Sequence, residues 1–152
     1  MKPVTVSVEV PQSPEEVFDY LDVLANHEVF TDHFLVDWET SGPERGAGAR
    51  ARMRVKKPGP EDWLDMEVIE SERPRRSVER ATGAKGRRLT QGSYALEPIE
   101  GGGTSISFEL AWLQAPRGER LIGPITRAVT RSANRKALRR LSERLAEREG
   151  GA

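Results

Sequence analysis

Few side chains in this 152-residue sequence have the type and spacing that catalysis or metal binding requires. No cysteine is present, which excludes thiolate nucleophiles, disulfides and cysteine-ligated zinc or iron–sulfur sites. The two histidines, His27 and His33, are six residues apart, which is not the spacing that places two ligands on one helix face. We interpret them as solvated histidines that flank a short helix, and we expect no metal ion.

A glycine triplet at residues 101–103 has the composition of a phosphate-binding loop but not its sequence. No Gly-Lys-Ser/Thr follows it, and a hairpin turn between two predicted strands explains it. We therefore expect no cofactor.

Two polar side chains on predicted strands remain as candidates for chemistry. Tyr94 could act as a general acid, because a positioned tyrosine can donate a proton. Arg80 is in phase with Val78 along its strand, so we expect it to point inward, where Arg80 or Arg127 could stabilise an enolate. The alternative for Tyr94 is a core residue whose hydroxyl is already hydrogen-bonded.

The charge of the chain is balanced in sum but not along its length. It carries 24 basic and 24 acidic side chains, and 36% of its residues are hydrophobic. Residues 1–47 contain two basic and ten acidic residues, a net charge of −8, whereas residues 117–149 contain ten basic and four acidic ones, a net charge of +6. The basic segment has no aromatic residues for base stacking, so we interpret it as a solvated helix face and expect no nucleic-acid partner.

The hydropathy of the chain is that of a protein that does not cross a membrane. No apolar run approaches the ~20 residues that span a bilayer, and the first ten residues alternate polar with apolar instead of forming a signal-peptide core. Because no disulfide requires an oxidising compartment, we expect a cytoplasmic protein with no stable membrane insertion.

Alternation of polar and apolar residues predicts seven strands. They fall at residues 4–10, 34–40, 49–55, 63–71, 76–82, 87–97 and 104–112. Ser13 and Pro14 predict the start of a helix, a second short helix is expected at 25–30, and helix formers continue from 121 to 149. Arginines alternate through 50–54 and acidic residues stand at 65 and 67, so we expect these two strands to pair with opposite charges side by side.

The apolar phase of these strands predicts an inward face rich in soft and aromatic side chains. Two methionines and three aromatics among them suit an adaptable small-molecule pocket, although the same residues could fill an ordinary core. The inward set is Met53, Leu64, Met66, Val68, Tyr94, Leu96, Ile106, Phe108, Leu110 and Trp112.

The C-terminal helix presents two different apolar faces. At 100° per residue, Leu138, Leu141 and Leu145 lie roughly opposite an N-terminal group formed by residues 122, 125 and 129. Either the helix breaks near residues 132–134, or it is straight and turns Ile122, Ile125 and Val129 outward. Such an outward patch, flanked by arginines, could dock a protein partner or a membrane surface.

The leucine-bearing face of this helix continues backward through polar residues. Arg127, Arg131 and Asn134 lie on it, and they could contact a carboxylate or hydroxyl of a ligand at the mouth of a pocket. The alternative for all three is exposure to solvent.

The order of elements and several local motifs resemble one superfamily. Residues 6–21, Val-Ser-Val-Glu-Val-Pro-Gln-Ser-Pro-Glu-Glu-Val-Phe-Asp-Tyr-Leu, resemble the opening of the START-like, helix-grip (SRPBCC) superfamily, in its polyketide cyclase/dehydrase-like branch. Residues 92–98, 102–104 and 137–141 are similar to its penultimate strand, last hairpin and C-terminal helix. The resemblance runs over residues 3–148.

The resemblance implies an α+β fold in which a curved, seven-stranded antiparallel sheet wraps around the long C-terminal helix, with two short helices after the first strand. It also implies a single domain at residues 1–149, followed by a disordered tail at 150–152, and an apolar cavity between sheet and helix. Members of this superfamily bind lipids, sterols, polyketides or plant hormones, and some are cyclases or dehydratases, so the fold alone does not select an activity.

The leading functional hypothesis is binding of a small hydrophobic molecule, such as a lipid, polyketide or aromatic compound, in that cavity. The expected ligand-binding residues are Met53, Met66, Arg80, Tyr94, Phe108, Leu110, Trp112, Arg127 and Arg131. A cyclase or dehydratase acting in the same cavity is the first alternative, although no acid–base residue of the enzymatic members matches this sequence position by position. The second alternative is a protein- or membrane-docking module that uses the C-terminal helix.

Overall fold

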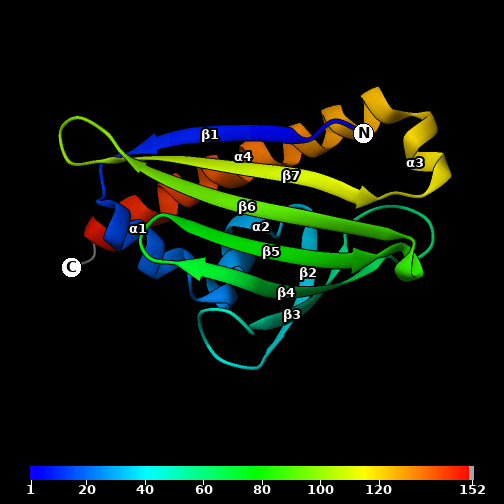
Figure 1. The fold of residues 1–152 in the computed structure, drawn as a ribbon, viewed down its shortest axis with the longest axis horizontal. Helices are drawn as coiled ribbons and strands as arrows, with labels where there is room; N and C mark the ends of the chain where they lie inside the picture. Colours follow the sequence, from blue (N-terminus) through cyan, green and yellow to red (C-terminus); the bar gives the residue numbers. More distant parts are fainter. Residues whose placement is uncertain (151–152) are drawn as a thin grey trace.

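Seven strands form one open antiparallel sheet in the computed structural model, which describes residues 1–150 (Figure 1). The strand order is β1-β7-β6-β5-β4-β3-β2, so the first and last strands are neighbours. The strands are β1 (Val4–Val10), β2 (Leu35–Ser41), β3 (Arg50–Val55), β4 (Trp63–Glu72), β5 (Arg76–Gly83), β6 (Arg88–Pro98) and β7 (Thr104–Gln114). The helical segments are α1 (Pro14–Leu21), η1 (Leu24–His27), α2 (Glu28–Thr31), η2 (Ala84–Gly86), α3 (Arg117–Leu121) and α4 (Gly123–Gly150). The expected α+β helix-grip fold is confirmed.

One face of the sheet, here called the inner face, is packed against the C-terminal half of α4 (Figure 1). Ala137, Leu138, Leu141 and Leu145 repeat at helical spacing and lie in one buried cluster with apolar residues of β1, β6, β7 and α1. A second buried cluster lies toward β2–β5 and includes Met53, which is fully buried. The core therefore occupies two regions of the inner face.

Local sequence signals act as predicted at the start of α1 and between β3 and β4. The Ser13 side chain caps α1 by accepting a hydrogen bond from the Glu16 amide at 3.2 Å. In the β3–β4 ladder the expected charge pairing is confirmed: Arg50 lies 2.8 Å from Glu67, and the next arginine of the row lies 3.6 Å from Asp65. These pairs are exposed and fix register more than they add stability.

The C-terminal helix is continuous. α4 runs from Gly123 to Gly150 without a break, so the straight-helix alternative holds. Gly150, assigned from sequence to a disordered tail, is the last residue of α4, and residues 151–152 lie outside the described part of the chain. Within residues 1–150 no helix has both the length and the hydropathy to span a bilayer.

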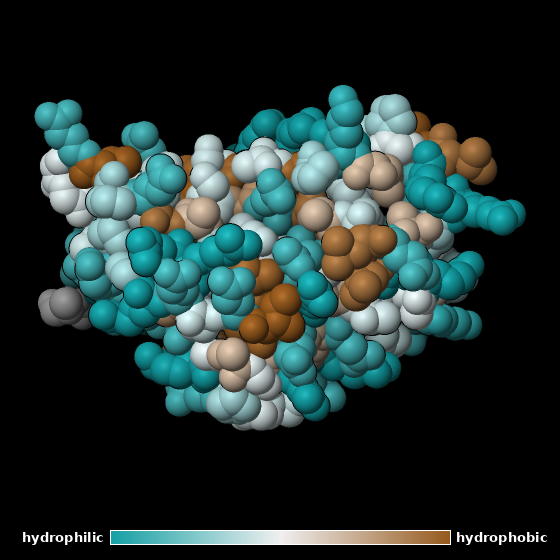
Figure 2. Space-filling model, in the orientation of Figure 1, coloured by the Kyte–Doolittle hydropathy of each residue, from teal (hydrophilic) through white to brown (hydrophobic). Residues whose placement is uncertain are grey.

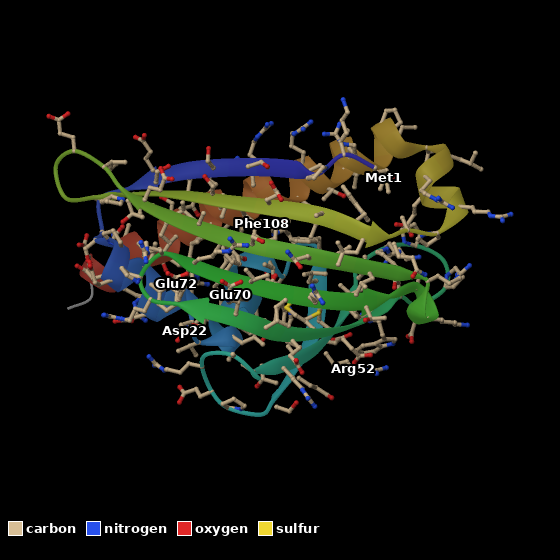
Figure 3. All side chains as sticks on the ribbon, in the orientation of Figure 1. Met1, Asp22, Arg52, Glu70, Glu72 and Phe108 are labelled. Carbon is tan, nitrogen blue, oxygen red and sulfur yellow. The ribbon has the colours of Figure 1, made fainter. Side chains whose placement is uncertain are left out.

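The opposite, outer face of the sheet is largely hydrophilic (Figure 2). Charged side chains of neighbouring strands lie on it, among them Arg52 of β3 and Glu70 of β4 (Figure 3). Hydrophobic atoms also gather at the α3 end of the molecule (Figure 2), where Leu121 is 84% exposed. Small hydrophobic patches also interrupt the outer face (Figure 2), where Ile69 is 38% exposed.

The packing of α4 predicts an unequal cost for two identical substitutions. Leu141→Ala should lower the free energy of unfolding by about 2–5 kcal/mol, because Leu141 is 0% exposed in the main core. Leu121→Ala, the control on α3, should change it by less than about 0.5 kcal/mol. Urea denaturation followed by circular dichroism measures both, and equal losses would contradict the assigned core.

Candidate functional site

A cavity of about 560 Å³ lies between the inner face of the sheet and the N-terminal half of α4. Its walls come from η1, α2, strands β2 to β7 and the segment from Glu119 to Asn134. Most of its lining is apolar, with aromatic side chains at Phe34, Trp38, Tyr94, Phe108 and Trp112. The cavity lies on the inner face, next to the region that the leucines of α4 fill.

The mouth of the cavity is bordered by exposed apolar side chains. Ile125 and Val129 line the cavity although they are 59% and 64% exposed, and Ile122 is beside them. The expected outward patch of α4 is thus a rim of the cavity and not a separate surface. Successive residues of a helix are 100° apart around its axis, so residues 122–129 and the later leucines lie on different faces of α4. The first group borders the cavity, and the leucines pack into the core.

Five of the residues expected from sequence to bind a ligand meet in this cavity. Four belong to the inner faces of β6 and β7, and Phe108 is midway along β7 (Figure 3). The five are Met66, Tyr94, Phe108, Leu110 and Trp112. Met53 instead belongs to the second core cluster and is absent from the cavity wall.

Arg80 does not face the cavity. It lies exposed on the outer face, where it donates a hydrogen bond to Gln91 at 3.1 Å. In β5 the inner face carries Glu79 and Ala81, which pair with Gly92 and Thr90 of the cavity wall. The sequence prediction was wrong because it took the buried Val78 as a marker of the inner face, whereas strand alternation places Val78 on the outer one.

The arginines of α4 also lie away from the cavity wall. Arg127 donates hydrogen bonds to the carbonyl oxygens of Lys2 and Pro3 at 2.9 and 3.0 Å, which ties α4 to the start of β1. Arg131 is partly exposed and is not part of the lining. Asn134 does line the cavity, but its amide donates to the Thr130 carbonyl of the same helix at 2.9 Å.

Three polar side chains, which we call the floor cluster, line the deepest part of the cavity: His27, Glu79 and Tyr94. They come from η1, β5 and β6, and each is buried. Nε2 of His27 donates to the Leu21 carbonyl oxygen at 2.8 Å, so in the neutral ring Nδ1 is a free acceptor. This Nδ1 lies 4.0 Å from Oε2 of Glu79, beyond hydrogen-bond distance. The sequence-based picture of His27 as solvated was wrong.

Burial keeps the floor cluster uncharged at neutral pH. It raises the pKa of Glu79 to about 8 and lowers the pKa of His27 to about 4, partly opposed by the Leu21 hydrogen bond and by Asp22. Burial also raises the pKa of Tyr94 well above its ordinary value, and the nearby Glu79 adds to the effect. Glu79 and Tyr94 therefore present O–H donors to the cavity and His27 presents an acceptor.

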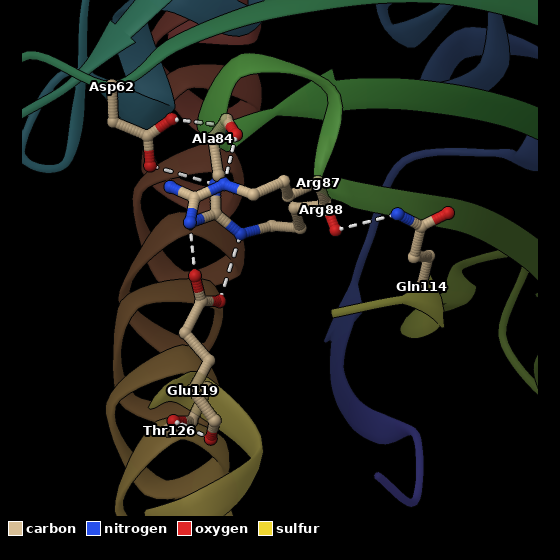
Figure 4. Close-up of polar contacts among 7 residues, drawn as sticks. All are labelled: Asp62, Ala84, Arg87, Arg88, Gln114, Glu119 and Thr126. Carbon is tan, nitrogen blue, oxygen red and sulfur yellow. Dashed lines mark hydrogen bonds and ion pairs between the residues drawn. The ribbon is translucent and has the colours of Figure 1, made fainter. Parts of the chain in front are cut away.

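A second polar group closes the other end of the cavity (Figure 4). Arg88 donates to Asp62 at 2.8 Å and to Glu119 at 2.9 Å, and the same aspartate accepts a hydrogen bond from the Ala84 amide at 2.9 Å. This network joins the loop before β4, the start of β6 and the short helix α3. Arg88 is four residues along β6 from Gly92, the partner of Glu79, a separation of about 13 Å at the rise of a strand.

Comparison with known proteins identifies the family. The family described as polyketide cyclase / dehydrase and lipid transport matches residues 1–148. The chain belongs to this family. No match was found among curated proteins.

Several solved structures have a fold similar to that of this member of the polyketide cyclase/dehydrase family. TTHA0849 from Thermus thermophilus is 19% identical with a TM-score of 0.73, over 96% of this chain and 98% of that one. KanY is 12% identical with a TM-score of 0.76, over 95% and 97%. DynU16, a putative protein in the dynemicin biosynthetic locus, is 20% identical with a TM-score of 0.67; the match covers 96% of this chain but 48% of DynU16. At these identities the likeness concerns the fold.

Of the floor cluster, Tyr94 was expected from sequence, whereas Glu79 and His27 were missed; the signal for Glu79 lies in the pairing between strands. Glu79 alternates with Ala81 in β5, but only the pairing with Gly92 and Tyr94's strand shows that this phase faces the cavity. The residues around His27 do not indicate that its ring is buried. Its hydrogen-bond partner is the backbone carbonyl oxygen of Leu21, six residues earlier, and a backbone group leaves no mark in the sequence. In this family member, therefore, the buried positions of Glu79 and His27 become visible only in the structure.

The pH dependence of stability should report the buried carboxyl of Glu79. Its pKa is about 8 in the folded protein against 4.5 ordinarily, so between these values the folded state holds a proton that the unfolded chain has released, and stability falls as pH rises. His27 opposes this only between about 4 and 6.5. From pH 6.5 to 8 we expect the free energy of unfolding to fall by up to about 1.4 kcal/mol per pH unit.

Two variants separate Glu79 from other carboxyl groups in this measurement. Glu79→Gln should flatten the profile between pH 6.5 and 8 in urea denaturation, because the amide does not titrate. Glu97→Gln, at an exposed position near the end of β6, should leave the profile of the unaltered protein. A Glu79→Gln profile as steep as that of the unaltered protein would contradict the assignment.

Proposed function

We propose that the protein binds a small hydrophobic molecule in the cavity between the sheet and α4. The observation that supports this most directly is a cavity of about 560 Å³ with a mostly apolar wall and a few polar side chains. Ligand sites have this volume and this mixture, in which apolar area provides affinity and a few polar groups fix orientation. The family description, which includes lipid transport, agrees with such a role.

The wall favours a ligand with rings over a purely aliphatic chain. Tyr94 and Phe108 pack with ring centroids 4.7 Å apart, and Trp38 and Trp112 also line the cavity. Flat aromatic surfaces stack on such rings or meet them edge to face. A bound molecule that reached the mouth would also cover Ile125 and Val129, removing exposed apolar surface from water.

Matched substitutions test whether the cavity is the binding site. Ala81→Phe fills the cavity at its wall and should weaken binding of a neutral fluorescent naphthylamine at least about tenfold, since overlap with the ligand removes its contacts. Ala95→Phe adds the same ring on the exposed face of β6 and should leave the affinity within about twofold. Equal affinity for the unaltered protein and Ala81→Phe would argue against this cavity.

A second candidate function, acid–base catalysis on an enolisable polyketide, has its own support in the floor cluster. A neutral carboxylic acid beside a tyrosine can donate hydrogen bonds to a carbonyl oxygen and stabilise the charge that develops there. Glu79 and Tyr94 are such a pair, and His27 adds an acceptor. The family description names cyclases and dehydrases.

Turnover of a model poly-β-ketone thioester, followed by mass spectrometry, tests the catalytic candidate. Tyr94→Phe should reduce the rate by about tenfold to a hundredfold, because it removes one donor from the oxygen that gains charge. Phe34→Tyr, which keeps ring size and adds a hydroxyl elsewhere on the wall, serves as the control. Full activity in Tyr94→Phe would remove Tyr94 from the mechanism.

A further inference from the structure

Glu79 differs from the other carboxyl groups of the cavity. Asp62 and Glu119 also line it, but both are paired with Arg88. Glu79 is 8% exposed, and within residues 1–150 it forms no hydrogen bond and no ion pair with a lysine or arginine. A buried carboxyl without a cation is stable only in its acid form, and its O–H then lacks an acceptor.

The fold holds the Glu79 carboxyl in a space that Gly92 keeps open. A Cβ atom at Gly92 would lie 3.0 Å from Oε1 of Glu79 and 2.9 Å from the Phe108 ring. Tyr94 follows Gly92 by two residues on the same face of β6, so it is the diagonal cross-strand neighbour of Glu79. Diagonal neighbours are within reach of long side chains, so both O–H groups can approach one point in the cavity.

We propose that Glu79 and Tyr94 together hold an uncharged carbonyl oxygen of the bound molecule, with the Glu79 carboxyl donating as an acid. A carbonyl oxygen has two lone pairs and accepts two hydrogen bonds, which matches two donors on adjacent strands. The proposal rests on the proposed ligand-binding function and names its ligand class: a hydrophobic ring ketone or related carbonyl compound.

The distribution of charge around the cavity sets the orientation of that ligand. The floor cluster offers no cation, so an ionised carboxylate placed there would be desolvated without compensation. At the opposite end Lys56 and Lys57 line the cavity, whereas Arg88, about 13 Å from Gly92 along β6, is already paired with Asp62 and Glu119. The carbonyl therefore points to the floor, and any anionic group of the ligand points to the two lysines.

The anchor should fail when Glu79 ionises. The titratable groups that face it are His27 from η1 and Tyr94 from β6, while β4 packs Val68 opposite it and β7 contributes Phe108. Asp22 acts on His27, where it partly opposes the lowering of the pKa by burial. None of these is a cation that would favour a carboxylate at neutral pH, and the raised pKa of Glu79, about 8, agrees with this.

Two probes that differ by one carbonyl group test the proposal. The first is the neutral fluorescent ketone propionyl-dimethylaminonaphthalene, and the second is dimethylaminonaphthalene without the propionyl group. The preference, defined as the ratio of their Kd values, should be about tenfold larger in the unaltered protein than in Glu79→Leu at pH 6.5, the change expected of one hydrogen bond. Glu79→Gln should keep most of the preference, because its amide still donates.

A second variant and a second pH distinguish loss of the carbonyl contact from misfolding of Glu79→Leu. Tyr94→Phe should reduce the preference by a similar factor without altering the charge of the floor. At pH 9.5 the unaltered protein should lose the preference, whereas Glu79→Gln should retain it. A preference that is equal in the unaltered protein, Glu79→Leu and Tyr94→Phe would overturn the carbonyl anchor and leave cavity binding intact. Failure of the unaltered protein to bind either probe would overturn the proposed function as well.

Discussion

The structure depends on a difference in packing between the two halves of α4. Only the C-terminal half of α4 carries leucines that pack into the inner face of the sheet, and Leu141 and Leu145 are buried there. The N-terminal half bears shorter or polar residues, such as Thr130 and Ala133, that face the sheet without reaching it. Because the helix is rigid and continuous, the filled half fixes the position of the unfilled half. The cavity is therefore a consequence of side-chain size along one helix.

The same empty space determines the chemistry of the groups that border it. Glu79 and His27 are shielded from water by the surrounding apolar wall, so the charged form of each is disfavoured, and their pKa values move in opposite directions. A single cation on the floor would reverse this for Glu79. The sheet places its arginines on the outer face, as with Arg80, or at the far end, as with Arg88. Strand alternation thus keeps the floor neutral.

Local patterns in the sequence were sufficient for the elements but not for the site. The N-cap at Ser13 and the charge pairing of β3 with β4 are encoded within a few residues or along one strand, so they could be read directly. The inward phase of β5 could not, because Val78 is an apolar residue on the outer face and Glu79 is a polar residue on the inner one. A polar residue that lines a cavity breaks the hydrophobic rule on which phase assignment depends. Met53 is the converse case: it points inward as expected, but it packs in the second core cluster and not in the cavity wall.

The contacts of α3 connect the cavity mouth to the rest of the fold. α3 buries none of its own side chains, and its attachment consists of Glu119, whose side chain pairs with Arg88 and whose carbonyl accepts from Thr126. The Arg88 and Glu119 side chains are 16% and 27% exposed and share two hydrogen bonds, so this is a partly buried, bidentate pair. Since Glu119 and Ile122 both border the cavity, this pair positions part of the cavity mouth without involving the leucines of α4. The position of α3 at the mouth thus depends on charge pairing, whereas the position of the filled half of α4 depends on apolar packing.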